Sequence, residues 1–296
     1  MMQALFIVTL QLAAKPDLAA VYRSARSYDK ATFRFQPPGG EALRRTRALL
    51  AHLVGALRPG APPEALVAEA RAAGFVLGLA QDAAGEVWVL HEPDGQRAGT
   101  GAFVLRPGGT RLVIEAPHTF YDEGTGEIAL ALFARLHAGV LFFNTVHRYA
   151  PPDGDQHPAD VAHAEGTCFA AAHQGLLDAA PSSSIVQVHG FGGRQPLDAA
   201  VKAVVSDGTP SPGQPAVRLR AALAKRWGAG TVKLYGVDAE VLGATTNVQG
   251  KAARRVGAPF LHIEMNAETR RALGRDVAPL GDALGEALGD LRRPHR

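Results

Sequence analysis

From about residue 110 onward, short apolar segments rich in β-branched residues alternate with longer segments of helical composition. The apolar segments are 111–116, 140–146, 184–189, 200–205, 231–235 and 260–265, and the helical ones are 126–138, 160–179, 213–227 and 267–289. Such alternation is typical of a mostly parallel sheet covered by helices on both faces. We therefore predict an α/β fold with three layers, α/β/α.

The first hundred residues have a different pattern. Two breaks rich in proline and glycine are each followed by an Ala- and Leu-rich stretch at helical spacing, 41–57 and 63–73. A β-hairpin is expected over 75–90, where two apolar runs flank a turn sequence. We predict that 1–100 form a small mixed α/β segment and that 101–296 form the main domain.

Charge and hydropathy exclude several classes of protein. The 31 Lys and Arg residues against 28 Asp and Glu give a net charge of +3, and the basic residues are scattered, so we expect no nucleic-acid partner. No apolar run reaches the ~20 residues of a membrane span. Residues 1–14 contain an apolar stretch that ends in small residues, as in a signal peptide, but no Lys or Arg precedes it. We expect a cytoplasmic protein, or a periplasmic or secreted one if 1–14 are a signal peptide; the oligomeric state is not predicted.

Residues with metal-binding and acid–base chemistry stand where the predicted strands end. Ligands of open parallel sheets bind at the carboxyl ends of the strands. His118 follows the first strand, Glu127 opens the next helix, and His189 ends a later strand just before Gly190. Glu264 lies within the last apolar run, where a buried carboxylate is unfavourable unless it has a hydrogen-bonding or charged partner or a function.

Two histidines and one glutamate from separate strand ends form a ligand set of the kind that catalytic zinc uses, with a fourth position open for water. A further carboxylate near that water can act as general base and then protonate a departing amine. The sequence therefore predicts a catalytic metal site. The same ligand types also accept manganese, cobalt or iron, so the prediction extends only to a divalent ion.

Four short motifs, in their order along the chain, resemble the pattern of N-formylglutamate amidohydrolase-like proteins. They are Ala116-Pro117-His118, Glu127, His189 and Ile263-Glu264-Met265-Asn266. These proteins are similar in fold to zinc-dependent N-acetylmuramoyl-L-alanine amidases and carboxypeptidases, with a phosphorylase/hydrolase-like core. The resemblance covers roughly residues 110–270.

The resemblance implies a role for each matching residue. His118, Glu127 and His189 would hold one zinc ion, and Glu264 would be the catalytic carboxylate. Arg148 would act in catalysis by gripping a substrate carboxylate in a bidentate pair.

The chain departs from the family pattern at two places. Thr119-Phe120-Tyr121 follows the histidine where the family usually has a glycine. The spacing of nine between His118 and Glu127 is short for a muramoyl amidase, so Asp122 or Glu123 is an alternative oxygen ligand.

Three polar residues outside these motifs are predicted to bind substrate. Lys251 and Arg194 would orient its acidic group, and Asn247 belongs to a polar, glycine-bounded stretch, 242–251, that is expected to form an active-site loop.

We thus predict a zinc-dependent hydrolase that cleaves an amide bond of an N-acyl amino acid or a small, peptide-like acidic substrate. One alternative is a peptidoglycan amidase or carboxypeptidase-like enzyme. Another is a non-catalytic protein that binds a small ligand on the same scaffold. Under that alternative the histidines are structural, and Glu127 only stabilises the N-terminus of a helix through the helix dipole. Glu264 would then pair with Arg254 or Arg255.

Overall fold

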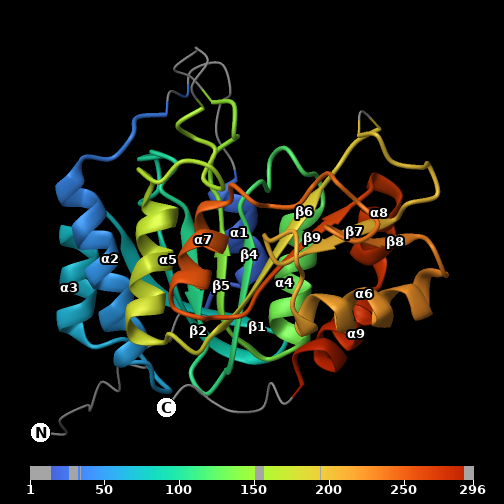
Figure 1. The fold of residues 1–296 in the computed structure, drawn as a ribbon. Coiled ribbons are helices and arrows are strands. Elements are labelled where there is room, and N and C mark those ends of the chain that lie inside the picture. The colour runs from blue at the N-terminus through green and yellow to red at the C-terminus, as the bar shows by residue number, and fades with distance from the viewer. Residues whose placement is uncertain (1–14, 27–32, 34, 151–156, 194, 290–296) are drawn as a thin grey trace, which may run out of the picture.

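The computed structural model describes all residues except 1–14, 27–32, 34, 151–156, 194 and 290–296. The predicted signal peptide and Arg194 therefore lie outside the described residues. The described chain forms three layers, with helices on both faces of a nine-stranded sheet (Figure 1). The predicted α/β/α fold is confirmed.

The strands of the sheet lie in the order β1-β2-β3-β5-β4-β6-β9-β7-β8. Their bounds are β1 Val76–Asp82, β2 Gly85–His91, β3 Ala102–Leu105, β4 Thr110–Ala116, β5 Ala138–Phe143, β6 Ser184–Gly190, β7 Ala203–Ser206, β8 Val232–Leu234 and β9 Phe260–Met265. The central strands β5, β4, β6 and β9 are parallel, so their carboxyl ends meet at one edge. At the two sides, β3 is antiparallel to β5 and β7 is antiparallel to β9.

The predicted division after residue 100 falls between two strands that pair with each other. Trp88 of β2 lies opposite Leu105 of β3, and β1 and β2 form the predicted hairpin. The first hundred residues thus contribute two strands to the sheet that the rest of the chain continues.

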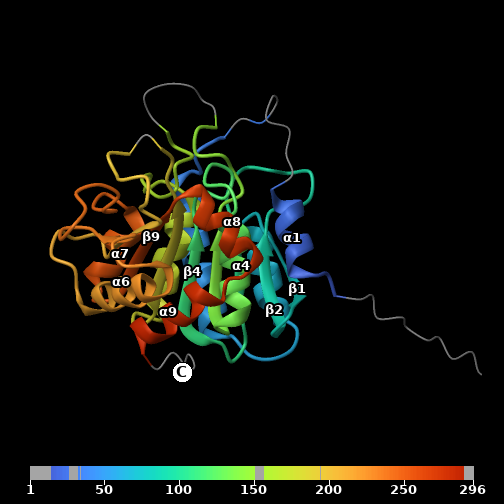
Figure 2. The same cartoon turned by 90° about the vertical axis from the view of Figure 1, so that its right-hand side faces the viewer.

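The helices fall into two groups, one on each face (Figures 1 and 2). One face carries α2 Gly40–Gly55, α3 Glu64–Ala72, α5 Cys168–Ala179 and α7 Val248–Arg255, and the other carries α1 Leu18–Ala25, α4 Thr125–Arg135, α6 Gln214–Trp227, α8 Ala267–Arg275 and α9 Ala278–Leu288. None of the helices in the described part of the chain is both long and apolar enough to cross a bilayer.

Local chemistry explains where the observed helices differ from the expected ones. The helix expected over 160–179 begins only at Cys168, because the side chain of Thr167 caps it by accepting from the backbone N–H of Ala170. The stretch predicted as an active-site loop instead contains the start of α7, which Asn247 caps in the same way. The segment expected as one helix over 267–289 is divided into α8 and α9.

Strand alternation sends apolar and polar side chains to opposite faces. On β9, Leu261, Ile263 and Met265 join the core that includes α4, α6 and α9. His262 and Glu264 therefore point to the face that carries α2, α5 and α7. The polar residues of the site lie on that face, at the carboxyl edge of the parallel strands.

Candidate metal centre

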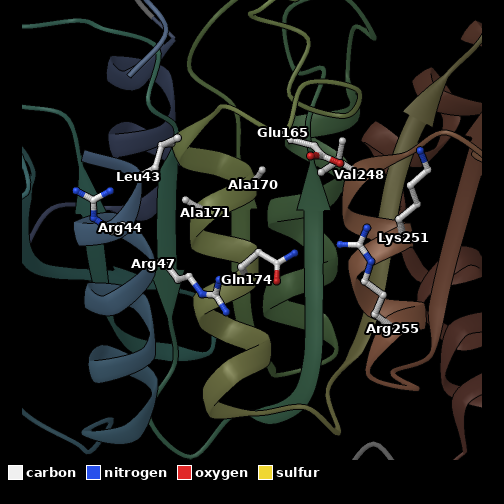
Figure 3. A pocket seen from close by; sticks show the side chains of 10 residues that line it. All are labelled: Leu43, Arg44, Arg47, Glu165, Ala170, Ala171, Gln174, Val248, Lys251 and Arg255. Carbon is white, nitrogen blue, oxygen red and sulfur yellow. The ribbon is translucent and has the colours of Figure 1, made fainter. Parts of the chain in front are cut away.

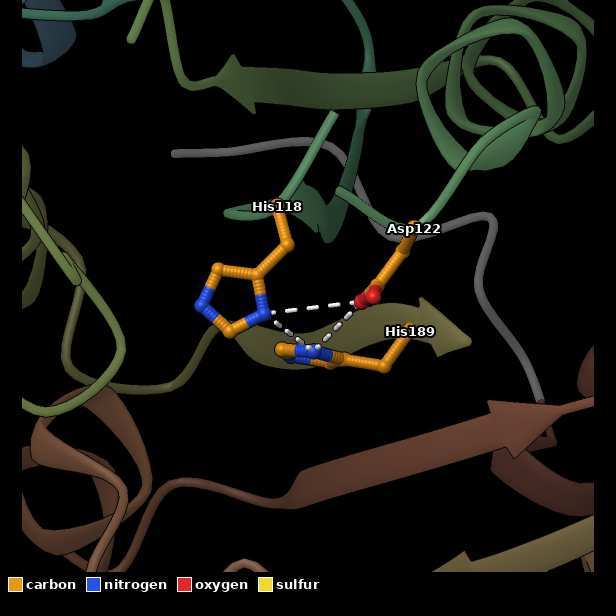
Figure 4. Close-up of side chains that lie close together, drawn as sticks. All are labelled: His118, Asp122 and His189. Carbon is orange, nitrogen blue, oxygen red and sulfur yellow. Dashed lines mark hydrogen bonds and ion pairs between the residues drawn. The ribbon is translucent and has the colours of Figure 1, made fainter. Parts of the chain in front are cut away.

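Three buried side chains converge at the carboxyl ends of β4 and β6 (Figure 4). His118 lies two residues beyond β4, and the backbone N–H of Asp122 donates to the His118 carbonyl (2.8 Å), so a tight turn holds both. Oδ2 of Asp122 is 3.4 Å from Nδ1 of His118 and 3.4 Å from Nδ1 of His189, and the two Nδ1 atoms are 3.2 Å apart. Two histidines and a carboxylate thus offer three ligand atoms to one point.

Glu127, which the resemblance makes a ligand, lies outside this group. It is in the first turn of α4, its side chain is 51% exposed, and it pairs with Arg26 (3.2 Å) and Tyr22 (3.3 Å). Asp122, the alternative oxygen donor left open by the short spacing, occupies the place expected for Glu127. Asp122 precedes α4, whereas Glu127 lies in its first turn, where the side chain bonds to Tyr22 and Arg26 rather than to the histidines.

Asp160 orients the ring of His118. Nε2 of His118 donates to Oδ1 of Asp160 (2.8 Å), and Arg148 donates from Nη2 to Oδ2 of the same carboxylate. Nη1 of Arg148 also lies 3.4 Å from Nδ1 of His118. Burial raises the pKa of Asp160, but the hydrogen bond from His118 and the charge of Arg148 outweigh it and hold that pKa at about 2. Asp160 therefore remains a carboxylate and fixes the tautomer of His118.

The three converging atoms favour a positive charge between them. Burial opposes charge on His118, yet the neighbouring Asp122 and Asp160 raise the pKa of His118. Burial also opposes charge on Asp122, but the neighbouring His118 and His189 keep the pKa of Asp122 well below its usual range. Burial lowers the pKa of His189 to about 4, so this second ring is neutral. The group thus combines one carboxylate with imidazole nitrogens that attract a cation.

Glu264 lies beside this group with one carboxylate oxygen unsatisfied. It is directly opposite His189 in the parallel pairing of β6 and β9, and it is 9% exposed. Oε1 is 3.7 Å from Nε2 of His262, while Oε2 is buried with no hydrogen-bond partner among the described residues. Burial and the charge of Asp122 raise the pKa of Glu264 to about 8.

Among the described residues, neither Arg254 nor Arg255 forms an ion pair with Glu264. Arg254 donates to the Asp207 carbonyl (3.2 Å), and no ion pair joins Arg255 to Glu264 in the part of the chain that the structure describes. Glu264 is thus a buried acid with no ion pair to an arginine among the described residues, an arrangement that can serve proton transfer.

A second donor group shares His189 and adds His262 and Glu264. The rings of His189 and His262 are 4.4 Å apart. Nδ1 of His262 is buried without a hydrogen-bond partner among the described residues, whereas the carboxylate of Asp160 orients His118. Because metal-binding histidines are normally oriented through their second nitrogen, the group of His118, Asp122 and His189 is the better formed of the two.

The remaining predicted substrate residues lie away from the convergent atoms. Lys251 lines a separate cavity of about 270 Å³ between α2, α5 and α7 (Figure 3). Asn247 is buried: its Oδ1 accepts from the N–H of Gly250 (2.8 Å) and its Nδ2 donates to Oε1 of Gln187 (2.8 Å). Both ends of the Asn247 amide thus form hydrogen bonds within the protein, and its role toward a substrate stays a prediction.

The sequence analysis missed several polar residues of the site. His262 and Gln187 each lie two residues before a predicted site residue, Glu264 and His189, so the two-residue period of a strand carries a signal for both. Asp160 carries no such signal, because it reaches His118 from a loop that is 42 residues further along the chain.

Exposed aromatic rings lie beside Arg148 at the edge of the site. Tyr121 and Tyr149 are 50% and 45% exposed, and their ring centroids are 5.2 Å apart. The Arg148 guanidinium lies 5.4 Å from the Tyr121 ring and 5.3 Å from the Tyr149 ring. Tyr121 directly precedes Asp122, so these exposed rings border the candidate metal centre.

No family model and no curated protein sequence matches this chain. Among solved structures, the chain is similar to a zinc-free form of YndL, with 14% identity over 67% of this chain and 93% of that chain and a TM-score of 0.43. It is similar to a bacteriophage poly-γ-glutamate hydrolase, with 13% identity over 66% of this chain and 91% of that chain and a TM-score of 0.40.

A third similar structure is a metallo-carboxypeptidase from Pseudomonas aeruginosa in complex with (2-guanidinoethylmercapto)succinic acid, with 15% identity over 88% of this chain and 71% of that chain and a TM-score of 0.42. None of these three is an N-formylglutamate amidohydrolase, so that part of the resemblance stays a prediction. At such low identities and TM-scores, the overlap says nothing about the chemistry of this chain's site.

Proposed function

We propose that this protein is a metal-dependent hydrolase in which His118, Asp122 and His189 hold one divalent ion, zinc by the type of donor. The observation that carries the proposal is the convergence of their three ligand atoms within 4.8 Å of one another, next to the unsatisfied carboxylate oxygen of Glu264. The set leaves room for the open coordination position that distinguishes catalytic zinc from structural zinc.

The positions of the protons support a cation at this point. Nε2 of His118 is the donor to Asp160, and Nε2 of His189 faces the side-chain oxygen of Gln187 (3.2 Å), so each neutral ring has its lone pair on Nδ1. The carboxylate of Asp122 can only accept. Three acceptor atoms at 3.2 to 3.4 Å repel one another unless a positive charge lies between them. A proton on His118 supplies part of that charge, and a divalent ion supplies it in full.

An ion held here would polarise a scissile carbonyl and lower the pKa of the attacking water. Glu264 would take the proton of that water on its free oxygen and deliver it to the departing nitrogen. The buried surroundings of Glu264 raise the pKa of its carboxyl and thereby suit it to both accepting and releasing a proton. Arg148, held by Asp160, would face the acidic group of the substrate.

We propose that the substrate is an N-acyl amino acid or a small peptide-like acid with a scissile amide. The support is the guanidinium of Arg148 at the mouth of the site, between the exposed rings of Tyr121 and Tyr149. A peptidoglycan amidase or a carboxypeptidase-like enzyme would be a more specific form of the same amide hydrolase. The substrates that the protein cleaves would distinguish these two activities from hydrolysis of N-acyl amino acids.

The first test is metal content, measured by elemental analysis of tag-free protein and of three variants. We expect about one zinc per chain in the wild type, loss of zinc in Asp122→Asn and His189→Ala, and retention in Glu127→Gln, which is the matched control because Glu127 is exposed and pairs with Arg26. Loss of zinc in Glu127→Gln with retention in Asp122→Asn would restore the ligand set implied by the resemblance.

The second test is hydrolysis of a panel of N-acyl amino acids, peptides with a free C-terminus and muropeptides. The zinc-loaded wild type is expected to cleave at least one class, and Glu264→Gln is expected to cleave none while it keeps its zinc. Zinc binding without cleavage of any amide would favour the non-catalytic binding protein. Loss of zinc in His262→Ala but not in His118→Ala would indicate that the ion is bound by the second donor group, His189, His262 and Glu264.

A further inference from the structure

A row of buried polar side chains continues from the metal centre into the core beneath α5 and α7. Gln187 lies two residues before His189 on β6, and Glu115 of β4 is its direct neighbour in the parallel pairing. Glu115 and Gln187 are both 0% exposed, and His173 of α5, which caps the row, is 1% exposed. A leucine at each position would fill this space without the cost of removing a charge from water.

Glu115 is the only charged acceptor in the row and the main determinant of the direction of its hydrogen bonds; the amide nitrogen of Gln187 also donates to Oε1 of Gln249 (3.2 Å). As a carboxylate, Glu115 only accepts, and it receives Nδ1 of His173 on Oε1 (2.7 Å) and Nε2 of Gln187 on Oε2 (2.7 Å). The amide nitrogen of Gln187 must therefore face Glu115, and its oxygen must face the other way.

That orientation places the oxygen of Gln187 against the outer nitrogen of His189. Oε1 of Gln187 is 3.2 Å from Nε2 of His189, and Nδ2 of Asn247 donates to the same oxygen (2.8 Å). An acceptor at this place puts the ring proton of His189 on Nε2. The lone pair of His189 is then on Nδ1, the atom that faces His118 and Asp122.

We infer that Gln187, in direct contact with His189, and Glu115, which orients the Gln187 amide, are positioning residues that together fix the tautomer of His189 and so prepare it as a metal ligand. The inference rests on the proposed function, since it gives His189 a ligand's role. This positioning role would account for the presence of a buried carboxylate at position 115, which packing alone does not explain. Asp160 orients His118 by direct contact, whereas His189 is oriented through an intervening amide that could adopt the opposite orientation.

The variant Glu115→Gln tests this directly, because it keeps the shape and removes the charge. A neutral amide at position 115 can donate as well as accept, so it no longer requires the nitrogen of Gln187 to face it. The orientation of Gln187 then depends only on its bonds to the uncharged Gln249 and Asn247, and any flip would present its nitrogen to Nε2 of His189. The ring proton would then move to Nδ1, into the metal position. We expect zinc affinity, measured by competition with a chelator, to fall about 10- to 100-fold.

Glu92→Gln is the matched control. Glu92 is also buried (1% exposed) and accepts from Ala98 (2.7 Å), Thr100 (3.0 Å) and Thr145 (2.9 Å), but it has no hydrogen bond to the row. Its substitution also removes a buried charge, and we expect it to leave zinc affinity at the wild-type value. Equal losses in both variants would overturn the inference, as would unchanged affinity in both.

A second measurement does not depend on metal binding. Long-range ¹H–¹⁵N spectra of the metal-free protein report which nitrogen of each histidine carries the proton, and the His189 signals are assigned by their absence in His189→Gln. We expect protonated Nε2 in the wild type and in Glu92→Gln, and a shift toward protonated Nδ1 in Glu115→Gln. If Glu115→Gln does not fold, Gln187→Met removes the acceptor itself and is expected to give the same shift.

The two proposals fail in different ways. Suppose that the wild type binds no zinc but has His189 protonated at Nε2, and that Glu115→Gln shifts this proton. The proposed metal function would then be wrong, while the inference that Glu115 orients His189 would stand. If instead the wild type binds zinc but metal-free His189 carries its proton on Nδ1, the inference about Glu115 and Gln187 would be wrong and the proposed metal function would stand.

Discussion

The two faces of the central sheet are built from the same strands and yet differ at the carboxyl edge. Toward α4, α6 and α9, the inward side chains remain apolar to the strand ends, as Val188 on β6 and Met265 on β9 show. Toward α5 and α7, the same strands change from apolar residues to Gln187, His189 and Glu264 as they approach that edge. Both faces carry an apolar core, but only the face toward α5 and α7 gives way to polar side chains at the carboxyl edge.

This division explains why buried polar residues are tolerated here. The apolar face fixes the positions of β6 and β9, so the polar side chains opposite it are aligned before any ligand binds. At the carboxyl edge, substitutions on the face toward α4, α6 and α9 are expected to change the free energy of unfolding without changing metal binding or turnover, whereas substitutions on the face toward α5 and α7 are expected to change metal binding or turnover.

Glu264→Gln should give the largest effect and the clearest separation of the two faces. Because glutamine cannot take a proton from water, we expect kcat on any substrate found to fall about 10²- to 10⁴-fold. Zinc content should remain about one per chain. A variant that retains wild-type turnover would remove Glu264 from the mechanism.

Asp160→Asn should have the next largest effect. The amide cannot hold the Nε2 proton of His118 as the carboxylate does, so zinc affinity should fall about 10- to 100-fold in a chelator competition. Asp178→Asn is the control, because Asp178 forms an exposed ion pair with Arg47 at 2.6 Å and is expected to have no effect on zinc. Equal affinities in the two variants would show that Asp160 does not orient the ligand.

Much of this division was predictable from the chain, and the residues that were not predictable share a physical cause. The three layers follow from apolar periodicity, and the convergence of His118, His189 and Glu264 follows from parallel strands that bring their ends to one edge. Glu127 was placed at the site by its order in a motif, but helix geometry turns it toward Arg26. Asp160 reaches the site through a long loop, whose path is set by tertiary packing rather than by local sequence.

The pH dependence of stability in metal-free protein distinguishes the buried carboxyl of Glu264 from an ordinary surface acid. Burial and the charge of Asp122 raise its pKa in the folded state from 4.5 to about 8. The folded state then binds more protons than the unfolded state between these values, so this group lowers the free energy of unfolding as pH rises through that window. Glu264→Gln removes the effect.

The measurement for this pH dependence is urea unfolding of both proteins in the presence of a chelator, at several pH values from 5 to 8. We expect the variant to gain stability relative to the wild type as the pH rises. A constant difference between the two proteins would mean that Glu264 is ionised throughout. Added zinc should reduce the trend, since a nearby cation favours the carboxylate.

Ile263→Val, one residue from Glu264 and on the opposite face, should have the smallest effect. Ile263 is fully buried in the apolar core, and the loss of one methylene group is expected to lower the free energy of unfolding by about 0.5 to 1.5 kcal/mol. Zinc affinity and kcat should stay at their wild-type values, because β9 keeps its pairing with β6. If this substitution changed zinc affinity more than it changed stability, the apolar face would be setting the position of the ligands rather than only supporting them. The two faces would then have to be treated as one coupled unit.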